Sequence, residues 1–260
     1  MPLTSTLTET WILLRGLLRE NGHWGAFVPR LEAALAPAQV LALDAPGCGA
    51  LYAQRSPISI AGGVQVLRAE LIQSGVSPPY HLLALSMGGM LAAYWSQHYP
   101  HEVAAQVWIN TSMRPFSGLS ERLRPQNYRR LARLLLPTTT AQEHEATLWQ
   151  LTSRMSDAGV VANWLALHRA HPVSRANALR QLWAAARFQA EPTAPTCPTL
   201  LLASTNDALV NVACSRAIAS AWKLPLHEHP SAGHDLPLDD GRWVVAQLQR
   251  WRKVTPASSI

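Results

Sequence analysis

Residues 82–90 read LLALSMGGM and place Ser86 between an apolar run and two glycines. The apolar run predicts a buried strand ending at Leu85, and the residues from Gly89 onward have a helical pattern. A strand that turns sharply into a helix needs small residues around the turn, because the backbone passes close to its neighbours there. Ala84 and Gly88 meet this need, so we interpret Ser86 as the residue at the tip of a strand-to-helix turn.

Short apolar runs of the same kind recur along the chain, with helical segments between them. The predicted strands are Trp11–Leu14, Val40–Leu43, His81–Leu85, Ala104–Ile109, Thr199–Ser204 and Leu226–Pro230. The predicted helices are Ile58–Gln73, Gly89–His98, Val212–Trp222 and Asp239–Lys253. Strands that are apolar throughout are typical of a parallel sheet with helices on both faces. The predicted fold class is therefore α/β, with a doubly wound, mostly parallel sheet of about six to seven strands.

The strand pattern stops between residues 115 and 192, where only helices are predicted. Thr140–Glu143 reads TAQE, which is a capping box, and Ser174 can cap the helix that follows it. Pro125 and Pro137 help to divide the stretch into roughly four helices.

These patterns divide the chain into three parts. They are the first part of an α/β core (residues 1–114), an inserted helical cap (115–192) and the second part of the core (193–260). A free-standing helical domain is the alternative. The strand pattern resumes at Thr199, and this favours the insertion because the chain must return to complete the sheet.

Two further polar residues follow predicted strands. Asp207 comes just after the strand Thr199–Ser204, and His234 lies in a glycine-containing loop after the next strand. The carboxyl ends of parallel strands lie at one edge of the sheet, so we expect both side chains to meet Ser86 there. A serine hydroxyl needs a base, and the base needs an orienting acid. The sequence thus predicts a catalytic triad of Ser86, Asp207 and His234.

Together, these motifs resemble the α/β-hydrolase superfamily, and in particular bacterial serine esterases with a helical cap. ALSMG resembles the nucleophile elbow G-x-S-x-G with Ala84 in the first glycine position, and LDAPGCG at residues 43–49 resembles a further family loop. STNDALV and AGHDLPLDD then follow in the order that the family has. MPLTSTLT stands where the family commonly has its first strands, so we interpret it as their abbreviated form.

The resemblance also implies an oxyanion hole made of two backbone amides. Met87 would supply one, and Leu17 would supply the other, because Arg15-Gly16 stands where the family frequently has His-Gly. Arg15 is interpreted either as a structural anchor of its loop or as a group that binds a substrate carboxylate. With Gly16 and Trp24, Arg15 makes up the predicted substrate-binding set.

The expected function is hydrolysis of a carboxylic ester or thioester with a small or medium acyl group, through an acyl-enzyme on Ser86. One alternative uses the same triad to cleave a C–C or C–O bond of a carboxylated metabolite. Another is a non-catalytic, hydrolase-like binding protein, which the intact triad disfavours. The sequence leaves the acyl length, the physiological substrate and the choice among ester, thioester, lactone and C–C bond open.

Composition excludes several other classes of function. The 260 residues are 48% hydrophobic, which favours a globular core over disorder. The net charge of +6 comes from scattered Arg and Lys without a basic run, so no nucleic-acid partner is expected. Three cysteines without CxxC spacing and the lack of nucleotide motifs predict no cofactor and no metal. We expect a cytoplasmic monomer or homodimer with no membrane span, acting on a small molecule.

The remaining titratable residues receive structural interpretations. Asp44 is expected to stabilise its glycine-rich turn, and Asp235 to point away from the neighbouring His234. Several histidines are expected to lie at the surface on helix faces or ends: His98, His101, His144, His168 and His171.

Overall fold

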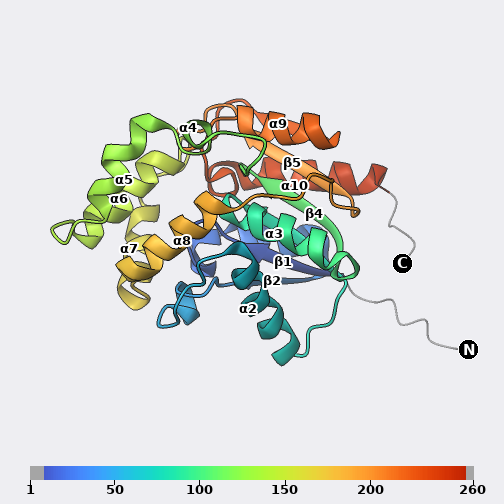
Figure 1. The fold of residues 1–260 in the computed structure, drawn as a ribbon, viewed down its shortest axis with the longest axis horizontal. Coiled ribbons are helices and arrows are strands. Elements are labelled where there is room, and N and C mark those ends of the chain that lie inside the picture. The colour runs from blue at the N-terminus through green and yellow to red at the C-terminus, as the bar shows by residue number, and fades with distance from the viewer. Residues whose placement is uncertain (1–8, 256–260) are drawn as a thin grey trace, which may run out of the picture.

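The computed structural model describes residues 9–255, which contain one parallel sheet flanked by helices (Figure 1). Within these residues the sheet has six strands in the order β2-β1-β3-β4-β5-β6, and all neighbours are parallel. The strands are β1 (Thr10–Leu14), β2 (Gln39–Leu43), β3 (Tyr80–Leu85), β4 (Val103–Ile109), β5 (Thr199–Ser204) and β6 (Leu226–His229). Each lies within one residue of its predicted bounds, so the predicted α/β class is confirmed.

Helices cover both faces of the sheet. Those packed on it are α1 (Phe27–Leu35), α2 (Ile60–Gln73), α3 (Met87–His98), α9 (Ala213–Trp222) and α10 (Leu236–Val254). Four of them were predicted, whereas α1 was not, although Phe27, Leu31 and Leu35 recur at helical spacing and all face the core. Helix α10 begins at Leu236, so Asp239 lies in its first turn rather than at its start.

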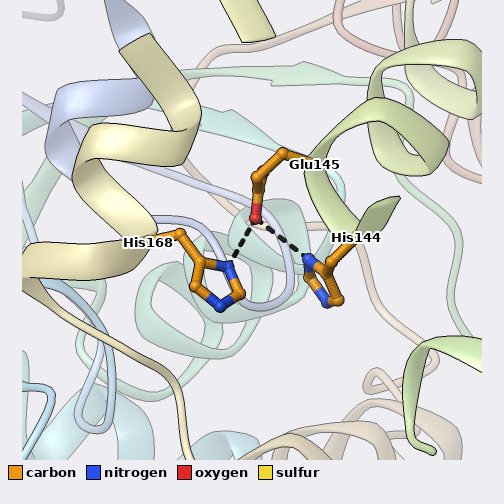
Figure 2. A group of neighbouring side chains, drawn as sticks. All are labelled: His144, Glu145 and His168. Carbon is orange, nitrogen blue, oxygen red and sulfur yellow. Dashed lines mark hydrogen bonds and ion pairs between the residues drawn. The ribbon is translucent and has the colours of Figure 1, made fainter. Parts of the chain in front are cut away.

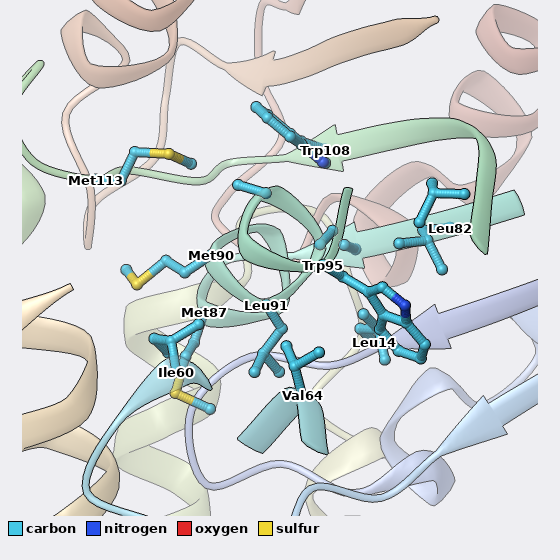
Figure 3. Close-up of a cluster of buried hydrophobic side chains, with 14 of the residues drawn as sticks. Leu14, Ile60, Val64, Leu82, Met87, Met90, Leu91, Trp95, Trp108 and Met113 are labelled. Atoms are coloured by element: carbon cyan, nitrogen blue, oxygen red, sulfur yellow. The ribbon is translucent and has the colours of Figure 1, made fainter. Parts of the chain in front are cut away.

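Successive strand residues point to opposite faces and so build two separate cores. Ile12 and Leu14 of β1 pack with α2, α3 and α9, while Trp11 and Leu13 pack with α1 and α10. Figure 3 shows the first core, where Trp95 of α3 is completely buried among the strands. Burying a large apolar side chain contributes about 1.5–3 kcal/mol, so this core fixes α3 firmly on the sheet.

The segment between β4 and β5 is helical, as predicted, but contains five helices rather than four. They are α4 (Leu119–Arg122), α5 (Tyr128–Leu134), α6 (Ala141–Thr152), α7 (Val160–Ala170) and α8 (Arg175–Arg187). The predicted caps form, since the Thr140 and Ser174 hydroxyls accept hydrogen bonds from the amides three residues later. Helices α5, α6 and α7 lie together at one end of the molecule (Figure 1).

The chain leaves the sheet for this helical segment and returns to it at one place. Arg114 and Gln189 form an isolated parallel bridge, and the Ala190 amide donates a 2.8 Å hydrogen bond to the Arg114 carbonyl. The two ends of the helical segment therefore lie side by side.

Two further predictions concern the N-terminal residues and membrane-spanning helices. The interpretation of MPLTSTLT as abbreviated strands falls on residues 1–8, outside the described residues. Among residues 9–255, no helix combines the length and the apolar character that crossing a membrane requires.

Candidate active site

Ser86 lies at the carboxyl end of β3, directly before α3. Its backbone has φ 57° and ψ −117°, a conformation that is strained for a residue with a side chain. The Ser86 amide donates to the Ile109 carbonyl at 2.9 Å, and the Thr111 hydroxyl donates to the Ser86 carbonyl at 2.8 Å. These bonds to the end of β4 and to the second residue after it hold the strained turn, which has the geometry of a nucleophile elbow.

The small residues around Ser86 are required by close backbone contacts. A Cβ atom on Gly88 would lie 2.3 Å from the Leu14 carbonyl oxygen, so only glycine fits there. Gly16 packs against the serine, since its Cβ would lie 3.6 Å from Ser86 Oγ. Ala84 is fully buried within the sheet between β1 and β4 and leaves the turn intact.

Asp207 and His234, which are 27 residues apart, meet at the same edge of the sheet. His234 Nδ1 lies 2.7 Å from Asp207 Oδ2, and both side chains are buried. The other oxygen of Asp207 accepts hydrogen bonds from the amides of Leu209 and Val210 at 2.7 and 3.0 Å. With its carboxylate fixed in this way, Asp207 orients the His234 ring through Nδ1 and leaves Nε2 free.

The surroundings of His234 favour its charged form. Burial alone would lower the pKa of His234, but the charge of Asp207 and its hydrogen bond outweigh burial, so the pKa lies above its ordinary value of 6.5. A carboxylate beside an imidazole stabilises the imidazolium in this way.

One cavity of about 490 Å³ connects these residues, because both Ser86 and His234 line it. Leu17 and Gly16, from the loop after β1, also line the cavity. Within residues 9–255, no hydrogen bond joins Ser86 Oγ to the His234 ring; the relay is formed from His234 to Asp207 only.

The comparison with known families agrees with this arrangement. The model of the Alpha/beta hydrolase family matches residues 12–247. The chain belongs to this family. A search of curated proteins finds no match.

Solved structures of other hydrolases share the fold. A lipase candidate (lip1) from Acinetobacter baumannii AYE has a TM-score of 0.77 at 18% identity, covering 96% of this chain and 87% of that chain. A thermophilic esterase from Thermogutta terrifontis has 0.74 at 21%, covering 94% and 89%. A hydrolase from Pseudomonas aeruginosa PA01 has 0.73 at 20%, covering 95% and 91%. At these identities the likeness establishes the fold, and it fits the membership of the alpha/beta hydrolase family.

As in the prediction, the first loop of this alpha/beta hydrolase carries Arg15 beside the site, but its guanidinium is engaged. Two Arg15 nitrogens contact the two Asp235 oxygens at 3.2 and 2.7 Å, and both side chains are buried. Asp235 is thus paired with Arg15, and among the described residues its side chain makes no hydrogen bond to His234. Because the paired nitrogens that would grip a substrate carboxylate are taken, the geometry favours the anchoring role of Arg15.

Trp24 lies elsewhere than predicted. It is buried against Phe27 in the core, with ring centroids 5.6 Å apart, and Arg15 Cζ lies 4.7 Å from the centroid of its ring. Trp24 does not belong to the cavity lining, which the neighbouring His23 reaches instead. We correct its assignment to a core residue: sequence proximity to the loop did not reveal which way the ring points.

The two predicted oxyanion donors lie at the loop and the helix that flank Ser86. Met87 is the first residue of α3, so its amide has no partner within the helix. The loop that carries Leu17 is shaped by Leu18, whose φ is 59° and whose amide donates to Gln181 Oε1 of α8 at 3.0 Å. The helical segment therefore helps to position the loop of the predicted oxyanion hole.

Sequence reasoning missed a residue that holds the His234 loop. The Asn110 side chain donates to the His234 carbonyl at 2.8 Å and accepts from the Ser204 amide at 2.7 Å. Asn110 was not among the predicted site residues, although its position directly after β4 was a usable signal. Asp44 behaves as predicted, since it accepts the amides of Asn21 and Ala50 and so stabilises its turn.

The histidines His144, His168 and His171, expected at the surface, line the cavity instead. His144 and His168 contact the buried Glu145 (Figure 2), and His171 contacts Glu20. They belong to α6, α7 and the residue after α7, and the packing of these helices, which the sequence does not specify, turns them inward. The cavity therefore has a polar wall, formed by these residues, as well as apolar parts.

Proposed function

We propose that this alpha/beta hydrolase cleaves a carboxylic ester or thioester through an acyl-enzyme. His234 takes the Ser86 proton, and Ser86 Oγ attacks the carbonyl carbon while Asp207 holds the imidazole. The negative oxygen accepts hydrogen bonds from the Leu17 and Met87 amides, each contributing about 10²–10³ in rate. His234 then protonates the departing alcohol or thiol. Water, deprotonated by His234, attacks the acyl-enzyme and releases the acid.

The observation that carries this proposal is the combination of Ser86, on a strained turn, and the Asp207-oriented His234 in one cavity. The mechanism requires a Ser86–His234 hydrogen bond, which we expect to form when substrate is bound. Catalytic hydrogen bonds are often long without substrate and tighten in the Michaelis complex.

The cavity lining favours a small or medium acyl group. Leucines from several elements supply apolar surface: Leu123, Leu131, Leu134, Leu135, Leu148 and Leu209. A cavity of about 490 Å³ suits an acyl ester of moderate size. In this proposal residues 115–192 act as a cap that supplies most of these walls.

Cys48 is a second candidate nucleophile in the cavity lining. Burial raises the pKa of its thiol to about 11. At neutral pH the thiol stays protonated and is a poor nucleophile, so Ser86 is the better candidate.

The alternative reaction, cleavage of a C–C or C–O bond in a carboxylated metabolite, relied on Arg15. The bonds from Arg15 to Asp235 weaken that argument. Because the cavity has a polar wall, carboxylated esters should be included among the substrates that are tested. Product analysis separates the two reactions, because hydrolysis yields one acid and one alcohol or thiol.

The decisive experiment is the Ser86→Ala variant, assayed with p-nitrophenyl acetate and butyrate. We expect turnover to fall by at least about 10³-fold, because the nucleophile is lost, while thermal unfolding stays unchanged. Ser120→Ala, at an exposed position of α4, is the matched control and should keep full activity.

Labelling with a fluorophosphonate gives an independent readout. The wild type and Ser120→Ala should be labelled, and Ser86→Ala should not. Undiminished turnover in Ser86→Ala, or labelling at a different serine, would refute the proposal.

A further inference from the structure

The polar wall of the cavity contains a compact group of three potential metal ligands (Figure 2). His144 Nδ1 and His168 Nδ1 lie 2.9 and 2.8 Å from the same oxygen, Oε1 of Glu145. The three ligand atoms lie within 4.8 Å of one another. Helix α6 supplies His144 and Glu145, α7 supplies His168, and all three residues line the cavity.

Glu145 is held as a carboxylate. The Arg19 guanidinium forms an ion pair with this buried side chain and so stabilises its negative charge. Arg19 binds only the second oxygen, with its Nη1 2.5 Å from Oε2. Oε1 therefore remains the atom shared by the two imidazoles.

We propose that His144, Glu145 and His168 form a binding site for a divalent transition-metal ion such as Zn²⁺. Two imidazole nitrogens and one carboxylate oxygen are a ligand set that zinc takes when a fourth position stays open. The ion would replace the hydrogen bonds that now join both Nδ1 atoms to Oε1, and each ring would carry its proton on Nε2.

The two separations between the imidazole nitrogens and Oε1 need little change to accept the ion. Ligands at about 2.1 Å around a tetrahedral ion lie about 3.4 Å apart, so each Nδ1 would move about half an ångström from Oε1. The fourth position would be filled from the cavity, by water or by a polar group of a bound molecule.

Arg19 has two opposing effects on this site. Its bond to Oε2 fixes the orientation of the carboxylate, as partners outside the coordination sphere commonly do. Its positive charge repels the ion, so we expect weaker binding than in a closed structural zinc site. The site departs from the expectation, drawn from the sequence, that the chain binds no metal.

The first test is titration of untagged wild-type protein with Zn²⁺ by calorimetry and with Co²⁺ by visible absorption. We expect saturable binding of one ion per chain, and a Co²⁺ spectrum typical of low coordination number with nitrogen ligands. Absence of saturable binding would overturn the proposal.

The second test compares histidine variants. His168→Ala and His144→Ala should each weaken binding by more than about tenfold, because each removes a ligand. His171→Ala is the matched control: it also lines the cavity and contacts a glutamate through Nδ1, but it lies outside the group. Its affinity should stay within about twofold of the wild type.

Two variants keep the result decisive if one fails to fold, and circular dichroism checks both. Binding that persists in the folded ligand variants, or that is lost equally in His171→Ala, would contradict the assignment. Ser86→Ala should bind the ion normally. A failure of the hydrolase proposal therefore leaves this test unaffected, and the reverse also holds.

Discussion

At the scale of the residue, Gly88 shows that the site requires a residue without a Cβ atom. The carbonyl oxygens of Leu14 and Arg15 approach Gly88 so closely that a Cβ would lie 2.3 and 2.9 Å from them. These are backbone atoms of β1 and of the loop that follows it, so they cannot move aside without disturbing the sheet. Glycine at the second position after Ser86 is therefore required by packing and is not only part of a sequence motif.

We expect Gly88→Ala to lower the free energy of unfolding by about 1–3 kcal/mol, as overpacking commonly does. Esterase activity should fall as well, since the Ser86 turn would shift. Urea unfolding measures the first effect. Gly118→Ala is the control, because a Cβ there meets no atom within 4 Å. Equal stability of the two variants would contradict the packing argument.

The raised pKa of His234 predicts the pH dependence of the reaction. His234 must be neutral to accept the Ser86 proton, so kcat/KM should rise with pH through a midpoint above 6.5. Asp207→Asn removes the charge that raises this pKa. The midpoint should then move to lower pH, while kcat falls by up to about 10⁴-fold because the ring loses its orientation. Rate profiles of both proteins decide this.

The raised pKa of His234 also makes the stability of the fold depend on pH. Because the folded pKa lies above the unfolded value, His234 stabilises the fold most fully below the unfolded pKa. This contribution is lost as the pH rises through the folded pKa. It therefore opposes the pH trend expected for activity.

At this scale, the sequence allowed a prediction where a residue lies in a loop that follows a strand. Ser86, Asp207 and His234 could be selected because the ends of parallel strands share one edge. Trp24 could not be placed, because the direction of a loop side chain depends on tertiary packing. The His144–His168 pair was missed for a similar reason, since the two residues meet only through the packing of α6 on α7.

At the scale of the element, α8 connects the helical segment to the core through buried amides. Gln181 accepts from the Leu18 amide and donates to the Pro46 carbonyl, 3.0 and 3.2 Å away. Asn177, one turn earlier, binds the Ser56 amide and the Gln54 carbonyl. Helix α8 is thus fixed on two loops of the core, whereas α5 has no buried residue.

We expect Gln181→Ala to destabilise the protein by about 1–3 kcal/mol, because it leaves the Leu18 amide and other buried groups without a partner. If the Leu17 amide belongs to the oxyanion hole, kcat should fall more than KM rises. Urea unfolding and steady-state kinetics measure both effects. Gln126→Ala, at an exposed position, should leave both quantities unchanged. Wild-type kcat in Gln181→Ala would exclude a positioning role.

The strands could be predicted to within one residue because each is an apolar run between turn residues. Helix α1 was not predicted, although its Pro29 lies in the first turn, where a proline needs no amide partner. The short helix α4 could not be predicted from the sequence, because four residues are too few to show a helical period.

At the scale of the whole molecule, the cavity lies between the sheet edge and the helical segment. Its apolar wall comes largely from α5 and the residues after it, and its polar wall from α6, α7 and the loop after β1. If the leucine wall receives the acyl chain, its side chains should set the chain length that is accepted.

We expect Leu135→Trp to reduce kcat/KM for octanoyl esters relative to acetyl esters by at least about tenfold, because the larger ring fills the cavity. A series of p-nitrophenyl esters of increasing acyl length measures this ratio. Leu119→Trp, at an exposed position outside the cavity lining, should not change it. An unchanged ratio in Leu135→Trp would place the acyl chain elsewhere.

The bridge between Arg114 and Gln189 has a consequence for how such proteins diversify. The chain segments that leave the core and return to it touch each other at this bridge. The length of the segment inserted between them can therefore change while the core keeps its spacing. If residues 115–192 form the proposed cap, exchanging them for a segment of another length should change the walls of the cavity and leave the β-sheet unchanged. The junction thus provides a natural graft point for engineering new substrate preferences.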